Sequence, residues 1–278
     1  MNKVWMITGA GRGLGREFAE EAVRRGDSVI ATVRKQLDDP FMKDEHVLQV
    51  VMDVTDPAAV ESGVKAGIER FGQIDILVNN AGFGMRGTFE EVSLDELRML
   101  FETDYFGLVS VTKAVLPYMR AKKQGMILNI SSQAGIMGFL GSTSYCSAKY
   151  AVAGLSHSLR SELSEFGIQV SVVCPGSFRT DFRDASSMKE AASIMTEYAD
   201  SAAGKNRENQ KLGNHKQPGD PKKAAIFLCD VVDSGKLPSE ILIGKACCAQ
   251  VREDLLRRIA EIDSYIDASS NTDFPAGQ

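Results

Sequence analysis

The chain has 278 residues, of which 44% are hydrophobic and 25% charged, and its formal net charge is −5 at pH 7. This length and apolar content are sufficient for one domain with a sizeable core. No run of Lys or Arg exceeds two residues, so the chain lacks the basic clusters that bind nucleic acid or anionic membranes, and neither is an expected partner. No apolar stretch reaches the roughly 18 residues of a transmembrane helix.

The composition favours a cytoplasmic protein. The N-terminus leads directly into a short apolar segment and lacks the length and cleavage site of a signal peptide. The five cysteines show no CxxC spacing and the three histidines are scattered. Reduced thiols are therefore expected, and a metal site is not.

Short apolar runs alternate with helical patterns along most of the chain. The alternation predicts an α/β fold: a single Rossmann-type domain over residues 1–278, with a doubly wound parallel sheet of about seven strands and helices on both faces. The predicted strands are residues 4–8, 28–33, 47–52, 74–79, 125–131, 169–174 and 240–243. The predicted helices are residues 14–25, 57–71, 94–123, 145–166, 219–230 and 249–264.

Two segments depart from this alternation. Residues 176–218 are polar and show no strand pattern. A long excursion of this kind in a compact domain is typical of a functional lid, which we predict here. Residues 267–278 are rich in Ser, Asn, Thr and Asp, and this composition predicts a frayed, flexible tail.

A glycine-rich turn follows the first predicted strand. Residues 8–15 read TGAGRGLG and lead into a helix. Glycine lets the backbone turn sharply and lets a pyrophosphate approach the N–H groups at the helix N-terminus. The turn therefore predicts a dinucleotide site, although such turns also occur without ligands.

A second group of residues offers proton chemistry. Tyr145 and Lys149 are four residues apart, which places them on one helix face, and Ser132 lies thirteen residues before Tyr145. A phenol with a pKa near 10 is a poor acid or base at pH 7, and lowering that pKa by about three units requires roughly 4 kcal/mol. A cation about 4 Å away supplies energy of that order. A second Tyr-x-x-x-Lys match at residues 118–122 lacks the upstream serine and is interpreted as a solvated helix end.

These motifs occur in the order typical of one enzyme family. TGxxxGxG at residues 8–15 is followed by NNAG at 79–82, then by Ser132, by YxxxK at 145–149 and by PGxxxT at 175–180. From residue 3 to about residue 180 the chain resembles the short-chain dehydrogenases/reductases. The resemblance implies hydride transfer with a nicotinamide cofactor.

The resemblance also assigns roles. Tyr145 would donate or accept the proton, Lys149 would lower the pKa of Tyr145 and bind the nicotinamide ribose, and Ser132 would hold the substrate oxygen. Asp53 and Val54 would contact the adenine edge, and Thr180 the carboxamide. The remaining implied cofactor contacts are Gly9, Gly13, Leu14, Asn80, Ala81, Gly82, Pro175, Gly176 and Phe178.

Charge at the end of the second strand indicates which cofactor is used. An NAD site of this kind has an acid there to bind the ribose 2′-hydroxyl, but residues 31–35 read ATVRK and the next acid is Asp38. Arg12 in the glycine turn and Arg34 suit a 2′-phosphate instead. We therefore predict NADP(H); the alternative is that both arginines are ordinary surface residues.

Asp104 departs from the family pattern. The family usually has asparagine at this position, as a fourth catalytic residue that helps to hold a water joined to the lysine. Aspartate keeps the size and an acceptor oxygen but loses the amide donor. If the helix backbone binds the water, little changes; otherwise a buried carboxylate adds charge near Lys149. Asp104 is kept as a candidate catalytic residue.

The predicted function is NADPH-dependent reduction of a ketone or aldehyde, or oxidation of a secondary alcohol. One alternative is a regulator or scaffold that binds NADP(H) without catalysis. Family members commonly pair through helices equivalent to residues 94–123 and 145–166, which implies a homodimer or homotetramer. Residues expected near the substrate are largely apolar: Phe83, Met85, Gln133, Ile136 and Phe139, with Met188, Ile194, Met195 and Tyr198 from the lid.

Overall fold

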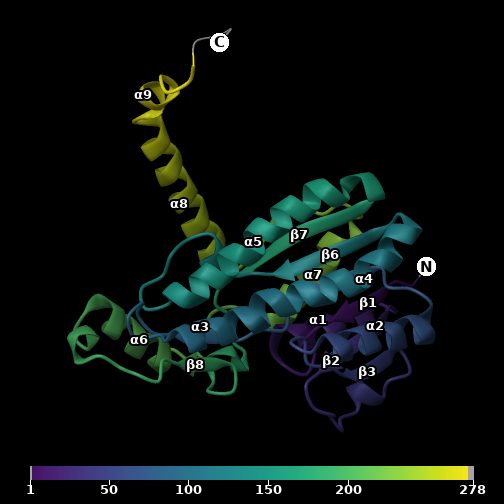
Figure 1. Cartoon of the computed structure of the whole chain (residues 1–278). Coiled ribbons are helices and arrows are strands. Elements are labelled where there is room, and N and C mark those ends of the chain that lie inside the picture. The colour runs from purple at the N-terminus through teal and green to yellow at the C-terminus, as the bar shows by residue number, and fades with distance from the viewer. Residues whose placement is uncertain (1, 275–278) are drawn as a thin grey trace.

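In the computed structural model, which describes residues 2–274, the main sheet has seven strands, all parallel (Figure 1). The strand order is β3-β2-β1-β4-β6-β7-β9, so the chain reverses direction across the sheet between β1 and β4. The predicted α/β fold and the seven strands are confirmed. Their bounds are β1 Val4–Ile7, β2 Ser28–Val33, β3 Val47–Val51, β4 Ile76–Asn79, β6 Gly125–Ile130, β7 Ile168–Pro175 and β9 Glu240–Ile243.

Helices cover both faces of the sheet because both faces of its strands are apolar. The helices are α1 Gly13–Arg24, α2 Pro57–Phe71, α4 Leu108–Lys122, α5 Thr143–Leu163 and α7 Pro221–Asp233. In β1, Trp5 and Ile7 pack on the side of α1 and α7, whereas Val4 and Met6 pack on the side of α2 and α4. Short 3₁₀ helices occupy Phe41–Lys43, Gln133–Gly135, Ser164–Phe166, Asp181–Arg183 and Thr196–Tyr198.

The helix predicted over residues 94–123 is interrupted by a different geometry. It begins as α3 Leu94–Phe101, becomes a π-helix over Glu102–Gly107 and continues as α4. Ser93 and Glu96 form a capping box at its N-terminus. A π-helical turn inside an α-helix is rare and frequently lies at a functional site. Here it contains Asp104.

Residues 176–218 contain a strand, so the prediction that this segment has none is wrong. β8 Met188–Glu190 pairs in parallel with β5 Gly84–Arg86. Each strand has only three residues, too few for a periodic pattern. The segment also forms helix α6 Ala202–Leu212. Its role as a lid stays a prediction.

The C-terminal helix α8, Lys245–Asp263, extends away from the rest of the molecule (Figure 1). Cys247 and Val251, near its start, are buried, whereas Leu255, Ile259 and Ile262 are exposed. Helix α9, Ile266–Ser270, follows. The flexible tail predicted over residues 267–278 stays a prediction, and residues 275–278 lie outside the described part. No helix within residues 2–274 has the length and apolar character needed to cross a membrane.

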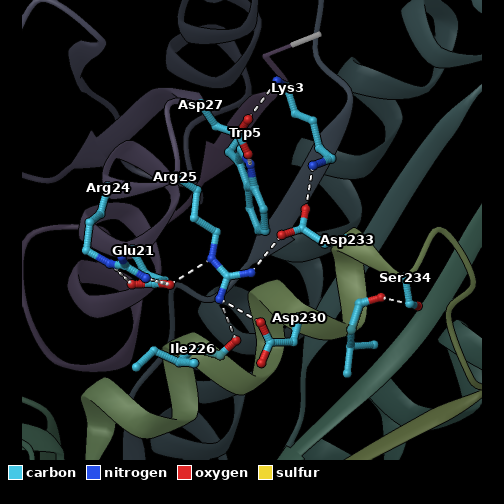
Figure 2. A network of polar contacts seen from close by, with 11 residues as sticks. Lys3, Trp5, Glu21, Arg24, Arg25, Asp27, Ile226, Asp230, Asp233 and Ser234 are labelled. Atoms are coloured by element: carbon cyan, nitrogen blue, oxygen red, sulfur yellow. Dashed lines mark hydrogen bonds and ion pairs between the residues drawn. The ribbon is translucent and has the colours of Figure 1, made fainter.

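Charged side chains join α1 to α7 at the edge of the sheet opposite the glycine turn (Figure 2). The Arg25 guanidinium donates to Glu21 at 2.7 Å, to Asp233 at 2.7 Å and to Asp230 at 2.8 Å. Lys3 donates to Asp233 from the N-terminal side. This network fixes the first strand and the first helix against α7.

Candidate active site

The glycine turn has the geometry that an anion requires. Gly9 and Gly13 have φ values of +67° and +59°, a region that other residues adopt only with strain. A Cβ atom at Gly15 would lie 2.3 Å from the Asn80 side-chain nitrogen. Helix α1 begins at Gly13, and it has neither a side-chain cap nor an acid in its first turn. Its first N–H groups therefore fit a pyrophosphate.

Asn80 holds this turn against the end of β4. Its side-chain nitrogen donates to the Thr8 carbonyl at 2.9 Å and to the Gly9 carbonyl at 3.2 Å. The Thr8 hydroxyl accepts from the N–H groups of Asn80 and Ala81, both at 2.9 Å. The side chain of Asn80 thus positions the candidate cofactor site, and Ala81 follows it at the same edge of the sheet.

The two arginines predicted to bind a 2′-phosphate are both exposed and lie after β1 and β2, the neighbouring strands of this part of the sheet. Neither has a carboxylate within ion-pair distance among residues 2–274. Arg12 instead donates to the Ser186 hydroxyl at 2.5 Å and to the Ser186 carbonyl at 2.8 Å. This contact between the glycine turn and the segment 176–218 was not predicted from the sequence.

The other predicted cofactor contacts follow strand ends at the same edge. Asp53, after β3, is exposed and accepts from the Thr55 N–H and hydroxyl at 3.0 and 2.8 Å, whereas Val54 is buried. Gly176, after Pro175 of β7, donates to the Ile243 carbonyl at 2.9 Å. In parallel sheets, ligands bind outside the carboxyl ends of the strands, where the strand order reverses.

Thr180 comes close to the glycine turn, whereas Phe178 lies in the core. A Cβ atom at Gly13 would lie 3.8 Å from the Thr180 Cβ. The Thr180 hydroxyl accepts from the Phe182 N–H at 3.3 Å. Phe178 is buried in the core beside the sheet. Leu14, the remaining predicted residue, packs partly buried against that same core.

Ser132, Tyr145 and Lys149 converge beside this site. Ser132 follows β6 and accepts from the Ala134 N–H at 3.1 Å, and its side chain lies close enough to Tyr145 to lower the pKa of the phenol. Tyr145 and Lys149 lie in α5, with the lysine nitrogen 5.6 Å from the centre of the tyrosine ring. The arrangement can move a proton at the phenol; the roles of the three residues stay predictions.

Asp104 reaches the same cluster from the π-helix. Its Oδ2 lies 3.0 Å from Lys149 Nζ, and the two side chains are 0% and 6% exposed. The other oxygen, Oδ1, accepts from the Phe83 N–H at 3.0 Å. Asp104 Oδ2 has no well-aligned hydrogen bond, so its contact with Lys149 is an ion pair. Lys149 Nζ also donates to the Ile130 carbonyl at 3.2 Å.

The pKa values in this cluster are shifted by burial and by the neighbouring charges. Burial raises the pKa of Tyr145; Lys149 opposes this shift and Asp104 reinforces it. Burial lowers the pKa of Lys149, but Asp104 and Tyr145 together outweigh burial, so the net pKa lies above its ordinary value. Burial raises the pKa of Asp104, and Lys149 and the Phe83 N–H oppose that shift.

The surroundings of Tyr145 include one residue that the sequence did not indicate. The Phe182 ring lies 6.0 Å from the Tyr145 ring, centre to centre, at a tilt of 52°. Two residues predicted near the substrate are buried: Met85 lies with Leu100 in the cluster on which Tyr145 packs, and Ile136 lies in another core cluster. Their place near the substrate stays a prediction. Both were placed there by the family resemblance, and apolar residues of this kind occur in pockets and in cores alike.

Three residues of the segment 176–218 form a group that resembles a cation site. Ligand atoms of Asp181, Asp184 and His215 all lie within 4.8 Å of one another. This group was not predicted from the sequence. Asp184 Oδ1, however, already accepts from Asn214 at 2.6 Å and contacts His215 at 3.0 Å. Side-chain contacts within the protein therefore account for the group without an ion.

Comparison with known proteins identifies the family. The family model described as "short chain dehydrogenase" matches residues 3–191. The chain therefore belongs to the short-chain dehydrogenases/reductases, as its motifs predicted.

Relatives match over nearly the whole chain. Oxidoreductase BOA17 of Botryotinia fuckeliana is 39% identical over 249 residues, which cover 88% of this chain and 89% of the relative. A 3-ketodihydrosphingosine reductase of Bacteroides thetaiotaomicron is 35% identical over 87% of this chain and 88% of its own length. A short-chain dehydrogenase structure from Streptomyces avermitilis matches 99% of this chain and 100% of its own with a TM-score of 0.89 and 35% identity. The protein is accordingly an oxidoreductase of this family.

Proposed function

We propose that the protein is an NADP(H)-dependent oxidoreductase that transfers hydride to the carbonyl carbon of a ketone or aldehyde, or from a secondary alcohol. One observation carries the proposal: Ser132, Tyr145 and Lys149 converge at the sheet edge that also contains the glycine turn. The cofactor supplies or accepts the hydride. The protein's own residues bind and orient the reactants and move the proton.

The three residues of the cluster have different tasks. The Ser132 hydroxyl, which lies beside the phenol, holds the substrate oxygen within reach of Tyr145. The phenol donates its proton to that oxygen in reduction and accepts it in oxidation. The lysine, 5.6 Å from the ring centre, favours the phenolate, and by family resemblance it binds the nicotinamide ribose.

Arg12 and Arg34 support NADP(H) over NAD(H). Both guanidiniums are exposed, and neither is paired with a carboxylate within residues 2–274. Since the first acid after β2 is Asp38, no carboxylate takes the position of a ribose 2′-hydroxyl partner. A 2′-phosphate would bind the two arginines through charge-assisted hydrogen bonds.

The alternative, a regulator or scaffold that binds NADP(H) without chemistry, has Asp104 as its support, because a buried carboxylate beside the lysine departs from the usual catalytic set. The retained serine, tyrosine and lysine favour the enzyme. A relative that is 35% identical carries the name of a ketone reductase, which supports the reductive direction.

The proposal extends to location and assembly. All five cysteines are free, in keeping with a cytoplasmic protein. A homodimer or homotetramer would pair through α4 and α5. Val111 and Val152 are fully buried in their own chain and are unavailable to a partner, whereas Tyr118 and Tyr150 are exposed on these helices. Light scattering of the purified protein tests the assembly.

The test begins with binding titrations of NADPH and NADH, followed by a panel of aliphatic and aryl ketones and aldehydes with the preferred cofactor. Tyr145→Phe is the matched control, since it removes only the hydroxyl. We expect tighter binding of NADPH, turnover of at least one carbonyl, and a loss of 10²-fold or more (~10²–10⁴) in the variant with binding retained. Full activity in Tyr145→Phe would refute the mechanism. Binding without turnover of any carbonyl would favour the regulator.

A further inference from the structure

We propose that Asp104 is a positioning residue that neutralises Lys149 and thereby keeps Tyr145 protonated, so that the site favours carbonyl reduction over alcohol oxidation near neutral pH. The inference rests on the proposed function and adds a direction to it. It leaves the equilibrium between alcohol and carbonyl unchanged, because the cofactor ratio sets that. It concerns the pH range in which each direction is fast.

The first step is the geometry of the ion pair. Asp104 Oδ2 and Lys149 Nζ are 3.0 Å apart, with side chains 0% and 6% exposed. Water does not screen this contact, so each charge acts strongly on the other. Asp104 is also held from its other side, by the Phe83 N–H at 3.0 Å. The carboxylate is therefore fixed against the lysine.

Space for this carboxylate depends on the glycine of the NNAG motif. A Cβ atom at Gly82 would lie 2.9 Å from Asp104 Oδ2, closer than side-chain carbons normally approach an oxygen. The π-helical turn places Asp104 on the inner side of the long helix, where it is buried. A local backbone irregularity and an absent side chain thus make room for the charge.

The second step is the ionisation state of Asp104. Both of its oxygens face donors, the Phe83 N–H and the Lys149 ammonium. A protonated carboxyl group would place its O–H against one of these two donors, and a buried donor that faces another donor is costly. Burial outweighs these contacts and keeps the pKa of Asp104 above its ordinary value, but the ammonium 3.0 Å away favours the carboxylate over the neutral acid.

The third step is the set of groups that face Tyr145 and Lys149. On α5 these are Cys146 and the two residues themselves, on β7 Cys174, after β6 Ser132, and on the π-helix Asp104. Burial raises the pKa of the Cys174 thiol to about 12 and also raises that of Cys146, so both thiols are neutral at pH 7. Within the described chain, Asp104 is the one carboxylate in this group.

The net charge beside Tyr145 determines how readily its phenol ionises. A lone Lys149 would attract the phenolate with a full positive charge, whereas the Lys149–Asp104 pair has no net charge. Carbonyl reduction requires the protonated phenol and oxidation requires the phenolate. Replacing Asp104 by Asn keeps the shape and the acceptor for Phe83 but restores the positive charge. The phenol should then titrate about one to two pH units lower.

The experiment titrates Tyr145 directly, without substrate. Phenolate absorbance is recorded from pH 6 to 11 for the wild-type protein and Asp104→Asn, each with Tyr145→Phe added as its blank, so that the other five tyrosines cancel. We expect a midpoint about one to two pH units lower in Asp104→Asn. An equal or higher midpoint would overturn the inference. Asp104→Ser, also uncharged, gives the same test if Asp104→Asn does not fold.

Rate measurements in both directions distinguish a failure of this inference from a failure of the proposed function. The probes are 4-nitrobenzaldehyde for reduction and 4-nitrobenzyl alcohol for oxidation, with NADPH and NADP⁺, between pH 6 and 10. Asp104→Asn should oxidise about tenfold faster at pH 7, in line with a shift of one pH unit or more. Intact turnover with unchanged pH profiles would refute the role of Asp104 alone. If the wild-type protein bound neither cofactor and turned over no substrate, the proposed function would be refuted, whatever the titration midpoint of Tyr145.

Discussion

Arg207 in α6 and Glu91 after β5 form an ion pair that is almost wholly buried. The Arg207 Nη1 lies 3.1 and 3.0 Å from the two Glu91 oxygens, and the side chains are 10% and 0% exposed. Glu91 also accepts from the N–H groups of Thr88 and Met195 at 2.8 and 3.1 Å. One carboxylate thus anchors α6 and the segment before it to the body of the molecule.

Arg207→Met should loosen the segment 176–218. The substitution keeps most of the side-chain length but leaves the Glu91 carboxylate buried without its cation, which costs about 3 kcal/mol in such pairs. The expected result is faster proteolytic cleavage within residues 176–218 and a lower thermal midpoint. Arg98→Met is the matched control, because its pair with Asp95 is exposed at both ends and contributes at most about 1 kcal/mol. Equal effects of the two substitutions would show that Glu91 does not anchor the segment.

Acid should destabilise the contact between α1 and α7. The pKa of Glu21 is lowered, chiefly by its hydrogen bond to Arg24. Burial tends to raise the pKa of Asp233, but Lys3 and Arg25 outweigh it and the net pKa is lowered. On acidification, both carboxylates are protonated at a higher pH in the unfolded chain than in the folded protein. Their stabilisation of the fold is therefore complete above about pH 4.5 and is lost as the pH falls through the lowered pKa values.

The single tryptophan reports on this loss, because Trp5 donates to Asp27 at 2.8 Å within the same region (Figure 2). Urea unfolding followed by Trp5 fluorescence should give an unfolding free energy that declines between pH 5 and pH 3 (roughly the carboxylate range). Arg25→Met should lower this free energy at pH 7 and make its decline with acid shallower. A steeper decline in the variant would contradict the assignment.

The main sheet could be predicted from the sequence because its strands are buried on both faces and appear as continuous apolar runs. β5 and β8 could not be predicted in this way. Each has three residues, and Met85 pairs with Lys189 more than a hundred positions away. The π-helix was missed for a similar reason: residues 94–123 have the pattern of one uninterrupted helix, and packing against α5 and the NNAG loop decides the local backbone.

In the candidate site, too, some contacts could be predicted from the sequence and others could not. The proximity of Tyr145 and Lys149 follows from helix geometry alone, and the glycine turn from its spacing. The ion pair between Lys149 and Asp104 joins residues 45 positions apart (149 minus 104). The sequence left two outcomes open for this aspartate, and the structure shows the carboxylate beside the lysine. The contact of Arg12 with Ser186 had no sequence signal, since serine is common in polar segments.

Removing the two arginines should change cofactor preference. Arg12→Ala and Arg34→Ala each delete a cation that a 2′-phosphate would bind, and one charge-assisted hydrogen bond contributes about 1.5–3 kcal/mol. We expect NADPH binding to weaken roughly 10- to 100-fold in each variant, with NADH binding nearly unchanged because NADH has no 2′-phosphate. Isothermal titration of both cofactors measures this, and Arg120→Ala, exposed at the end of α4, is the control.

Arg12 needs a second comparison, because its guanidinium also bonds Ser186 at the hydroxyl and the carbonyl. Ser186→Ala removes the hydroxyl contact and leaves the arginine in place. If Arg12 acts through the phosphate, Ser186→Ala keeps the preference for NADPH while Arg12→Ala loses it. If both variants weaken NADPH and NADH alike, Arg12 serves chiefly to hold the segment 176–218 against the glycine turn, and the preference for NADP(H) then rests on Arg34 alone.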